Sequence, residues 1–196
     1  MNAAWDELPA TFTTLTARER GLHVRDLYRL RDEGEVVQLS RGVFRKADAP
    51  PAAHPDLLAI THRAPVAVVC CVSAAALHDL TDEIPPAVQI AVPRDHRPPH
   101  IRFPPVEVFR FAVATFEIGL TAAEVAPGEW VRVYSPERTV VDLMRLRASL
   151  GSPLALSALR RYLRSRAARP GAVLDIARAL KVLSSVRAVI DVLIAE

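Results

Sequence analysis

The sequence has only two cysteines, only two lysines and no long apolar run. Cys70 and Cys71 are adjacent inside an apolar stretch, which indicates buried small side chains in a reducing compartment rather than a disulfide framework. No segment approaches the roughly 20 apolar residues of a membrane span, and the N-terminus lacks a signal-peptide pattern. We therefore expect a cytoplasmic protein without a membrane partner.

The usual signatures of catalysis are also missing. The six histidines show no metal-ligand spacing with cysteine, and there is no glycine-rich phosphate loop, nucleophile elbow or paired-carboxylate motif. A restriction-type nuclease needs a lysine beside acidic residues on adjacent strands, and the chain has only Lys46 and Lys181. The sequence predicts neither an enzyme, nor a cofactor, nor a metal site.

What the sequence does contain is typical of a folded protein with two domains. The chain has 196 residues, of which 51% are hydrophobic and only seven are glycine. The proline-rich segment 47–55 predicts a linker, so we expect one domain over residues 1–48 and another over residues 49–196. The net charge is +3, and 23 of the 25 basic residues are arginine, so an anionic partner is favoured where arginines cluster.

The first domain shows the order of a winged helix-turn-helix. Residues 14–20 predict a first helix, residues 21–23 a tight turn and residues 24–33 a second helix. Strands over 36–39 and 43–45, joined by a turn that contains a glycine, predict the hairpin called the wing.

The second helix of this unit has two distinct faces. Leu27 and Leu30 lie three residues apart and are expected to face the core, with Leu22 and Val24 closing the turn over them. Arg25 and Arg29 lie four residues apart and share another face. Because the major groove of DNA is about 12 Å wide and admits one helix, these two arginines are predicted to contact bases or adjacent phosphates.

Other polar residues of the first domain are predicted to position the DNA backbone or to stack against it. The full set of predicted DNA-binding residues is Arg18, His23, Arg25, Tyr28, Arg29, Ser40, Arg41, Arg45 and Lys46. Two alternatives stay open, because arginines on a short helix are often only a solvated face and winged helices also serve as protein-interaction modules.

The second domain is predicted to be mixed α/β with a helical end. Two helices with a short strand between them should precede residue 80, the second helix beginning at Ser73 as its N-cap. Strands over 88–92, 106–111 and 130–134 and a helix opened by Ser135 should follow, with helices thereafter near 152–164, 172–183 and 186–195. The fold class is therefore α+β: an N-terminal winged helix-turn-helix, a mixed α/β domain and a helical segment over about 152–196.

Two charged groups in this domain have structural as well as functional interpretations. Arg138 and Asp142 lie at helical i,i+4 spacing, so we expect an ion pair rather than catalysis. Arg160, Arg161 and Arg164 fall on one helix turn and are interpreted either as a solvated face or as a surface for an acidic partner or additional DNA backbone.

Four runs of sequence resemble the AbiEi-type antitoxins of type IV toxin–antitoxin systems. They are Leu22–Arg45, Ser73–Leu80, Val88–Arg94 and Ser135–Leu143, and together the resemblance spans about residues 10–146.

The resemblance implies a winged helix that binds inverted repeats in the promoter of its own operon, and a remainder that neutralises a nucleotidyltransferase-like toxin. It therefore implies a transcriptional autorepressor and antitoxin with two partners, promoter DNA and a cognate toxin. The alternatives are a protein-interaction antitoxin that no longer represses, and a stand-alone winged-helix regulator without a toxin partner.

Overall fold

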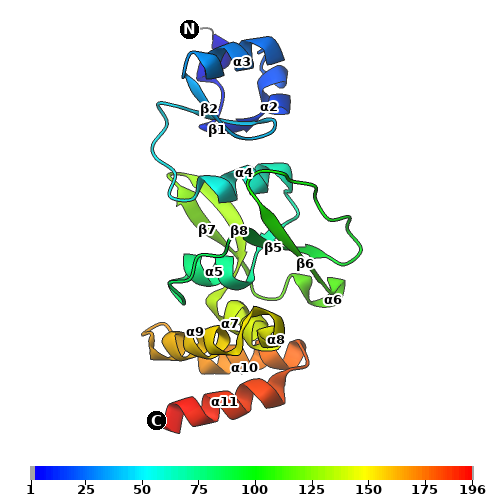
Figure 1. Cartoon of the computed structure of the whole chain (residues 1–196), viewed down its shortest axis with the longest axis vertical. Coiled ribbons are helices and arrows are strands. Elements are labelled where there is room, and N and C mark those ends of the chain that lie inside the picture. The colour runs from blue at the N-terminus through cyan, green and yellow to red at the C-terminus, as the bar shows by residue number, and fades with distance from the viewer. Residues whose placement is uncertain (1–2, 196) are drawn as a thin grey trace. The chain divides into compact units, whose positions relative to one another are not determined.

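The computed structural model describes residues 3–195 and divides into two compact units (Figure 1). The first unit comprises the chain up to residue 67 together with residues 99–106 and 124–131. The second comprises residues 68–98, 107–123 and 132 onward. Each unit therefore combines segments that are far apart in the sequence.

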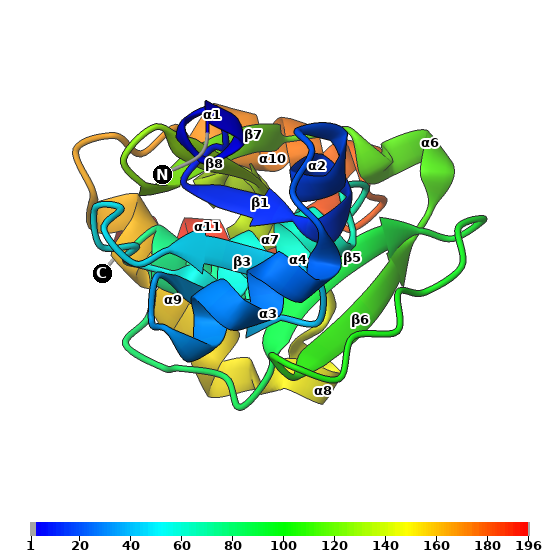
Figure 2. The same cartoon turned by 90° about the horizontal axis from the view of Figure 1, so that it is seen from above.

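The first unit contains the winged helix-turn-helix and one further helix. Its elements are α1 (Ala3–Asp6), β1 (Thr11–Thr13), α2 (Thr14–Glu19), α3 (Val24–Asp32), β2 (Val36–Ser40), β3 (Val43–Lys46) and α4 (Pro55–Arg63). The strands form an antiparallel sheet in the order β1-β3-β2, and Figure 2 shows β1 and β3 next to α2 and α3. The predicted helices and wing are present, whereas β1 was not predicted, because three residues are too few to show an alternating pattern.

Aromatic packing holds the helices onto this sheet. Phe12 of β1 lies opposite Phe44 of β3, and the two buried rings stack with their centroids 6.1 Å apart. Leu27 of α3 is fully buried against them, as its position predicts. Val24 does not close the turn as expected, because it stands in the first turn of α3 with 38% of its surface exposed.

The second unit is built on a five-stranded sheet with the order β6-β5-β4-β8-β7. The strands of this sheet are β4 (Val68–Val69), β5 (Val88–Pro93), β6 (Val106–Phe111), β7 (Leu120–Ala126) and β8 (Glu129–Tyr134). Residue 106 of β6, residues 124–126 of β7 and residues 129–131 of β8 belong to the first unit. Its helices are α5 (Cys71–Leu77), α6 (Val113–Phe116), α7 (Pro136–Arg145), α8 (Arg147–Leu150), α9 (Ser152–Arg164), α10 (Pro170–Ala179) and α11 (Leu183–Ala195). Strand β4 runs antiparallel to β5 and parallel to β8, so the sheet is mixed. The α+β class and the helical C-terminal part are as predicted.

Helix α7 is the centre of the helical layer. Ser135 caps it by accepting a hydrogen bond from the backbone N–H of Arg138, and Pro136 occupies its first turn. Residues 137–144 are all buried, since α7 packs against α5, α9 and α10. A helix covered on every side explains why its charged residues must find partners inside the protein.

The predicted ion pair of Arg138 and Asp142 is confirmed, and both side chains are fully buried on α7. Arg138 is fully buried, and its Nε donates to Oδ2 of Asp142 over 2.8 Å. Its Nη1 donates to the carbonyls of Thr115 and Ile118, and its guanidinium lies 4.2 Å from the ring centre of Tyr134. A buried cation needs such a set of partners, because removal from water costs several kcal/mol.

Three sequence-based predictions in this unit need correction. Helix α5 begins at Cys71 with Cys70 as its N-cap, and the hydroxyl of Ser73 instead accepts a hydrogen bond from the backbone N–H of Gln89. The last two helices are separated at residues 180–182 rather than at 184–185, where Lys181 takes a positive φ of 60°. Strand β7 was not predicted, because its run of alanine and polar residues has little of the β-branched and aromatic content that marks a strand.

Replacing Arg138 with methionine is expected to lower the free energy of unfolding by about 3–5 kcal/mol, because Asp142 then keeps a buried charge with only Arg145 beside it. Urea unfolding at pH 7 measures this. Arg178→Met is the matched control, since Arg178 makes an exposed pair with Asp175 three residues away and should change stability by less than about 1 kcal/mol. Equal effects of the two substitutions would contradict a special role for the buried pair.

A second prediction concerns Glu137, whose buried carboxylate accepts hydrogen bonds from the Tyr162 hydroxyl and the Arg169 guanidinium. Burial alone raises the pKa of this carboxyl, but backbone, Ser135, Arg169 and Tyr162 hydrogen bonds outweigh it, so the pKa is lowered. A carboxyl whose pKa is lowered in the folded state stabilises the protein at neutral pH. This stabilisation is lost as the pH falls through the lowered pKa.

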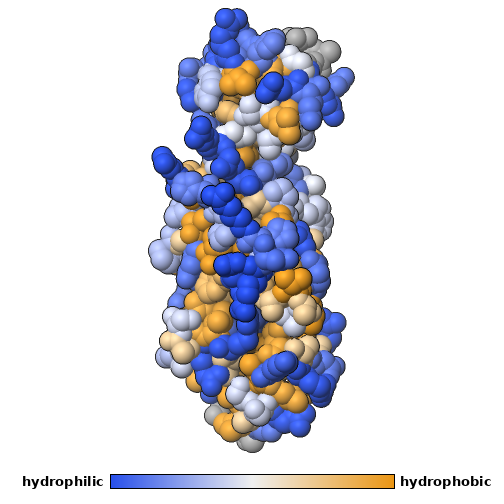
Figure 3. Space-filling model, turned by 90° about the vertical axis from the view of Figure 1, so that its right-hand side faces the viewer, coloured by the Kyte–Doolittle hydropathy of each residue, from blue (hydrophilic) through white to orange (hydrophobic). Residues whose placement is uncertain are grey.

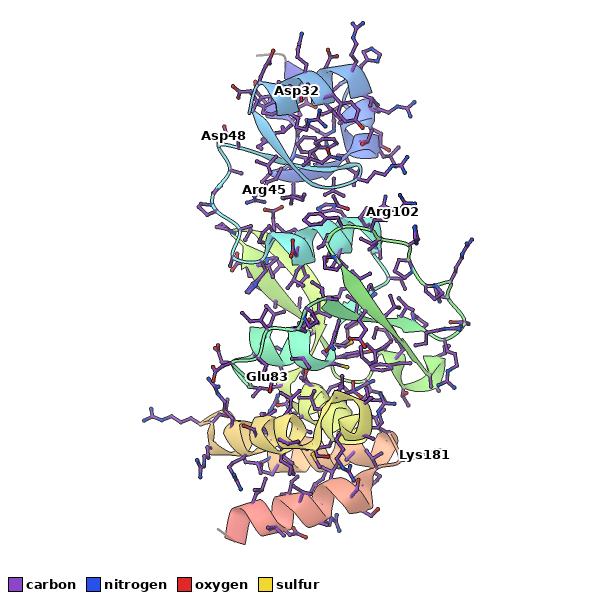
Figure 4. All side chains as sticks on the ribbon, viewed as in Figure 1. Asp32, Arg45, Asp48, Glu83, Arg102 and Lys181 are labelled. Carbon is purple, nitrogen blue, oxygen red and sulfur yellow. The ribbon has the colours of Figure 1, made fainter. Side chains whose placement is uncertain are left out.

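Glu137→Gln should therefore be less stable than the wild type at pH 6.5, and this difference should shrink at pH 3.5. Urea unfolding at both pH values checks it. Glu83→Gln is the control, because Glu83 is exposed and its carboxylate makes no ion pair within residues 3–195 (Figure 4). A difference for Glu137→Gln that is independent of pH would show that the charge of Glu137 contributes nothing.

Candidate nucleic-acid interface

The turn between α2 and α3 has the tight geometry of a helix-turn-helix. Thr13 caps α2, since its side chain accepts from the backbone N–H of Thr16 over 3.1 Å. Gly21 takes a φ of +83°, which allows the backbone N–H of Leu22 to return to the carbonyl of Ala17 at 2.9 Å. The chain then enters α3 through His23 as its N-cap.

The outer face of α3 carries the two arginines predicted to meet DNA. Arg25 and Arg29 are both exposed. Arg29 lies 3.8 Å from a carboxylate oxygen of Asp26 and 3.8 Å from one of Glu33, while the described part of the chain offers Arg25 no ion pair. Exposed pairs at such distances contribute little, so Arg29 is free to exchange them for a phosphate or a base.

The tip of the wing is fixed against the start of α2. Gly42 takes a φ of +76°, and its carbonyl accepts a hydrogen bond from the backbone N–H of Thr14 over 2.9 Å. Arg41, the neighbouring residue, is exposed at this tip. The wing therefore presents Arg41 to solvent from a rigid turn.

Other predicted wing residues point into the unit. Ser40 is buried, and its hydroxyl donates to the carbonyl of Phe103 over 2.6 Å. The side chain of Arg45 is only 8% exposed; it pairs with Glu129 and donates to the hydroxyl of Thr11 and the carbonyl of Pro50. Figure 4 shows Arg45 on the inner side of the hairpin, toward α4. The side chains of Ser40 and Arg45 therefore hold the wing hairpin in place.

The remaining predicted residues divide between surface and packing. Arg18 and His23 are exposed. Tyr28 packs edge-on against Phe44 with its other side under the guanidinium of Arg31. Lys46 donates to the carbonyl of Leu8 and lies 5.1 Å from the ring centre of Trp5, so its ammonium is already engaged. Tyr28 nevertheless keeps 43% of its surface exposed. Of the predicted residues, those exposed are therefore Arg18, His23, Arg25, Tyr28, Arg29 and Arg41.

The structure adds three basic residues that sequence reasoning missed. Arg63, His100 and Arg102 line a cavity together with Arg41, although they lie far away in the sequence. Figure 3 looks onto the side of the first unit that carries Arg102, and the surface there is mostly hydrophilic. The one sequence signal for His100 and Arg102 was the basic content of the proline-rich stretch 93–105, which nothing connected to the wing, and Arg63 had no such signal.

In the second unit, Arg160, Arg161 and Arg164 are exposed on α9 and line one cavity of about 340 Å³ with Ser157 and Ser165. Arg161 also pairs with Asp82 over 2.9 Å. The predicted cluster is therefore real as a surface feature, and its partner stays a prediction.

Within residues 3–195, no helix combines the length and the apolar character needed to cross a membrane. In the same range, no group of three or more histidine, cysteine, aspartate or glutamate side chains is arranged to hold a metal ion.

Residues 9–45 match the family described as "Transcriptional regulator, AbiEi antitoxin". The winged helix-turn-helix resembles this family, and residues 9–45 are called the AbiEi-type segment below. This confirms the resemblance inferred from the sequence for the N-terminal region, and the matched range ends within β3. The AbiEi-type segment includes α2, α3 and Arg41 at the wing tip, so the match covers the exposed arginines described above.

The fold as a whole is similar to a solved structure. The crystal structure of the RV2827C protein from Mycobacterium tuberculosis aligns over 93% of this chain and 73% of that chain, with 22% sequence identity and a TM-score of 0.54. At this identity the likeness concerns the fold alone. No curated protein matches the sequence.

The inward position of Arg45 leads to a testable distinction. Arg45→Met is expected to lower the free energy of unfolding by roughly 2–4 kcal/mol, because Glu129 loses its buried partner. The salt dependence of DNA binding should stay unchanged at a temperature where the variant is folded. Arg41→Met, four positions away on the same hairpin, should leave the free energy of unfolding unchanged and reduce the salt dependence of DNA binding. Thermal unfolding and binding titrations at several salt concentrations check both; a reduced salt dependence for Arg45→Met would place its guanidinium on DNA.

Proposed function

We propose that this chain is the DNA-binding autorepressor and antitoxin of a type IV toxin–antitoxin system. Its AbiEi-type segment would bind double-stranded promoter DNA, with inverted repeats as the expected operator. The rest of the chain would neutralise a nucleotidyltransferase-like toxin. The observation that carries the proposal is the exposed arginine pair on α3 within a helix-turn-helix that matches a family of transcriptional regulators and antitoxins.

The dimensions of α3 suit insertion into DNA. Nine residues make a helix about 13 Å long, and the major groove accepts one helix at a time. Arg25 and Arg29 would reach base edges or the adjacent phosphates from its outer face. Arg18 on α2 and Arg41 at the wing tip would contact the backbone on either side and set the register.

The antitoxin half of the proposal is supported by the matching family, whose description names an antitoxin as well as a regulator. The exposed surface of Arg160, Arg161 and Arg164 on α9 is where we propose that an acidic partner or further DNA backbone binds. We also propose the division of labour expected from the sequence, with residues 1–48 on DNA and residues 49–196 on the toxin.

The DNA-binding half is tested by titrating the purified chain with its upstream promoter and with a scrambled duplex of equal length, at 0.1 and 0.3 M salt. Arg25→Ala with Arg29→Ala should reduce the preference for the promoter by at least about tenfold, since one lost base contact costs roughly 1–3 kcal/mol. Both side chains are exposed, so the melting temperature should not change.

The matched control is Arg178→Ala with Arg187→Ala, which removes two exposed arginines from the second unit. If this control weakens promoter binding as much as the α3 variant does, Arg25 and Arg29 do not read the sequence. A wild type without promoter preference would contradict repression by this chain.

The antitoxin half is tested in cells by inducing the reading frame next to this gene with and without the chain. Restored growth in the presence of the chain supports an antitoxin. Promoter binding without any toxic neighbour would instead identify a stand-alone regulator, and rescue without promoter binding would identify an antitoxin that no longer represses.

A further inference from the structure

A basic cavity adjoins the wing within the first unit. It has a volume of about 220 Å³ and is lined by Ser40, Arg41, Arg63, His100, Arg102 and Phe103. These residues come from the wing tip, the C-terminal end of α4 and the loop that precedes β6. Figure 4 shows Arg102 on that loop.

Hydrogen bonds fix the three segments around the cavity. The guanidinium of Arg63 donates through Nη1 to the carbonyl of Arg41 and through Nη2 to the carbonyl of His100, at 3.3 and 3.4 Å. The hydroxyl of Ser40 donates to the carbonyl of Phe103 over 2.6 Å. Because all three acceptors are backbone carbonyls, the cavity keeps its frame without using a carboxylate.

The charge of the cavity is therefore not balanced by the protein. Three arginines line it, no acidic side chain does, and Arg41, Arg63 and Arg102 form no ion pair with any residue between 3 and 195. Like charges held together repel one another unless an anion lies between them. Arginine forks suit phosphate in particular, because their paired N–H groups match its oxygens.

We propose that this cavity binds a phosphate of the DNA backbone, beside the phosphate contacted by the wing. The inference rests on the proposed function and extends it, because it moves Arg63 and Arg102 from the part of the chain assigned above to the toxin into the DNA interface formed by α2, α3 and the wing. Arg41 belongs both to the wing tip and to the cavity, so the two surfaces are continuous. The volume is several times the roughly 30 Å³ that one water molecule occupies, which leaves room for a phosphate group.

The location explains what such a contact would do. Backbone contacts carry no sequence information but fix the position of the protein on the duplex. Arg63 is hydrogen-bonded to the carbonyl of Arg41, so the same guanidinium would hold the wing tip in place while it attracts the phosphate. The cavity would thereby orient the wing relative to the helix that reads the groove.

The test uses Arg102→Ala in the full chain, because Arg102 is exposed on a loop and holds no other segment in place. Arg187→Ala, an exposed arginine on α11, removes the same charge elsewhere. Binding to the promoter duplex and to the scrambled duplex is measured between 0.1 and 0.4 M salt. The slope of log K against log salt is negative, and Arg102→Ala should make it shallower by about 0.9 on both duplexes. This corresponds to about fivefold weaker binding at 0.15 M salt. Arg187→Ala should give the slope of the wild type.

The possible failures can be told apart. Promoter preference in the wild type, with equal slopes for Arg102→Ala and Arg187→Ala, overturns the phosphate site and leaves the proposed function standing. Loss of slope in Arg102→Ala without any promoter preference supports the phosphate site and overturns sequence-specific repression. A wild type that binds neither duplex overturns both.

A further arm separates backbone phosphate from a free phosphate. Thermal unfolding is compared in inorganic phosphate and in chloride at equal ionic strength. If phosphate stabilises the wild type but not Arg102→Ala, and the DNA slopes of the two proteins are equal, the cavity serves a small phosphate-bearing ligand and the DNA assignment is wrong. A reduced slope on DNA supports the proposal whatever inorganic phosphate does.

Discussion

The second unit depends on one buried charge, the guanidinium of Arg138. It binds Asp142 on its own helix, the carbonyl of Thr115 in α6, the carbonyl of Ile118 in the following loop, and the ring of Tyr134 at the end of β8. Losing any of these would leave a desolvated charge, so sheet, loop and helix must keep one mutual arrangement. Gly119 shows how tight this is: a Cβ there would lie 2.6 Å from the Cβ of Arg138. The helical layer that carries α9 and its arginines is placed by this contact.

The first unit uses a cation in the same way to hold its wing. Arg45 binds Thr11, Pro50 and Glu129 from the inner side of β3, while Arg41 at the tip has no such partners among the residues described. Two arginines four residues apart on one hairpin thus have different environments, since Arg45 holds the wing in place and Arg41 lies at the surface. In a chain with 23 arginines, what decides the purpose of each is its burial and its acceptors rather than local charge density.

Much of the fold could be predicted because its determinants are local. A few consecutive residues determine each of three features: the cap of α2 by Thr13, the turns at Gly21 and Gly42 with positive φ, and the start of α7 at Ser135-Pro136. The Arg138–Asp142 pair was predictable from its spacing on a helix. What sequence reasoning missed depends on contacts over long separations. No sequence pattern near Arg45 indicates that it pairs with Glu129, 84 residues away. Likewise, no pattern near Arg41 indicates that Arg63 and Arg102 lie beside it. The burial of Ser40 and Arg45 and the basic cavity are consequences of that tertiary pairing.

The attachment of the wing by Ser40 to Phe103 and by Arg45 to Glu129 has a consequence for how such a protein can diverge. The helix-turn-helix is continuous in sequence, yet its hairpin is completed by residues from much later in the chain. If residues 1–48 were exchanged between relatives at the linker, the new wing would lack the Phe103 carbonyl and the Glu129 carboxylate that hold it. Recombination at this boundary is therefore disfavoured. Under the proposed function, new operator preferences would be reached more easily by point substitutions on the outer face of α3, where side chains such as Arg25 have no internal partners in the described structure to lose.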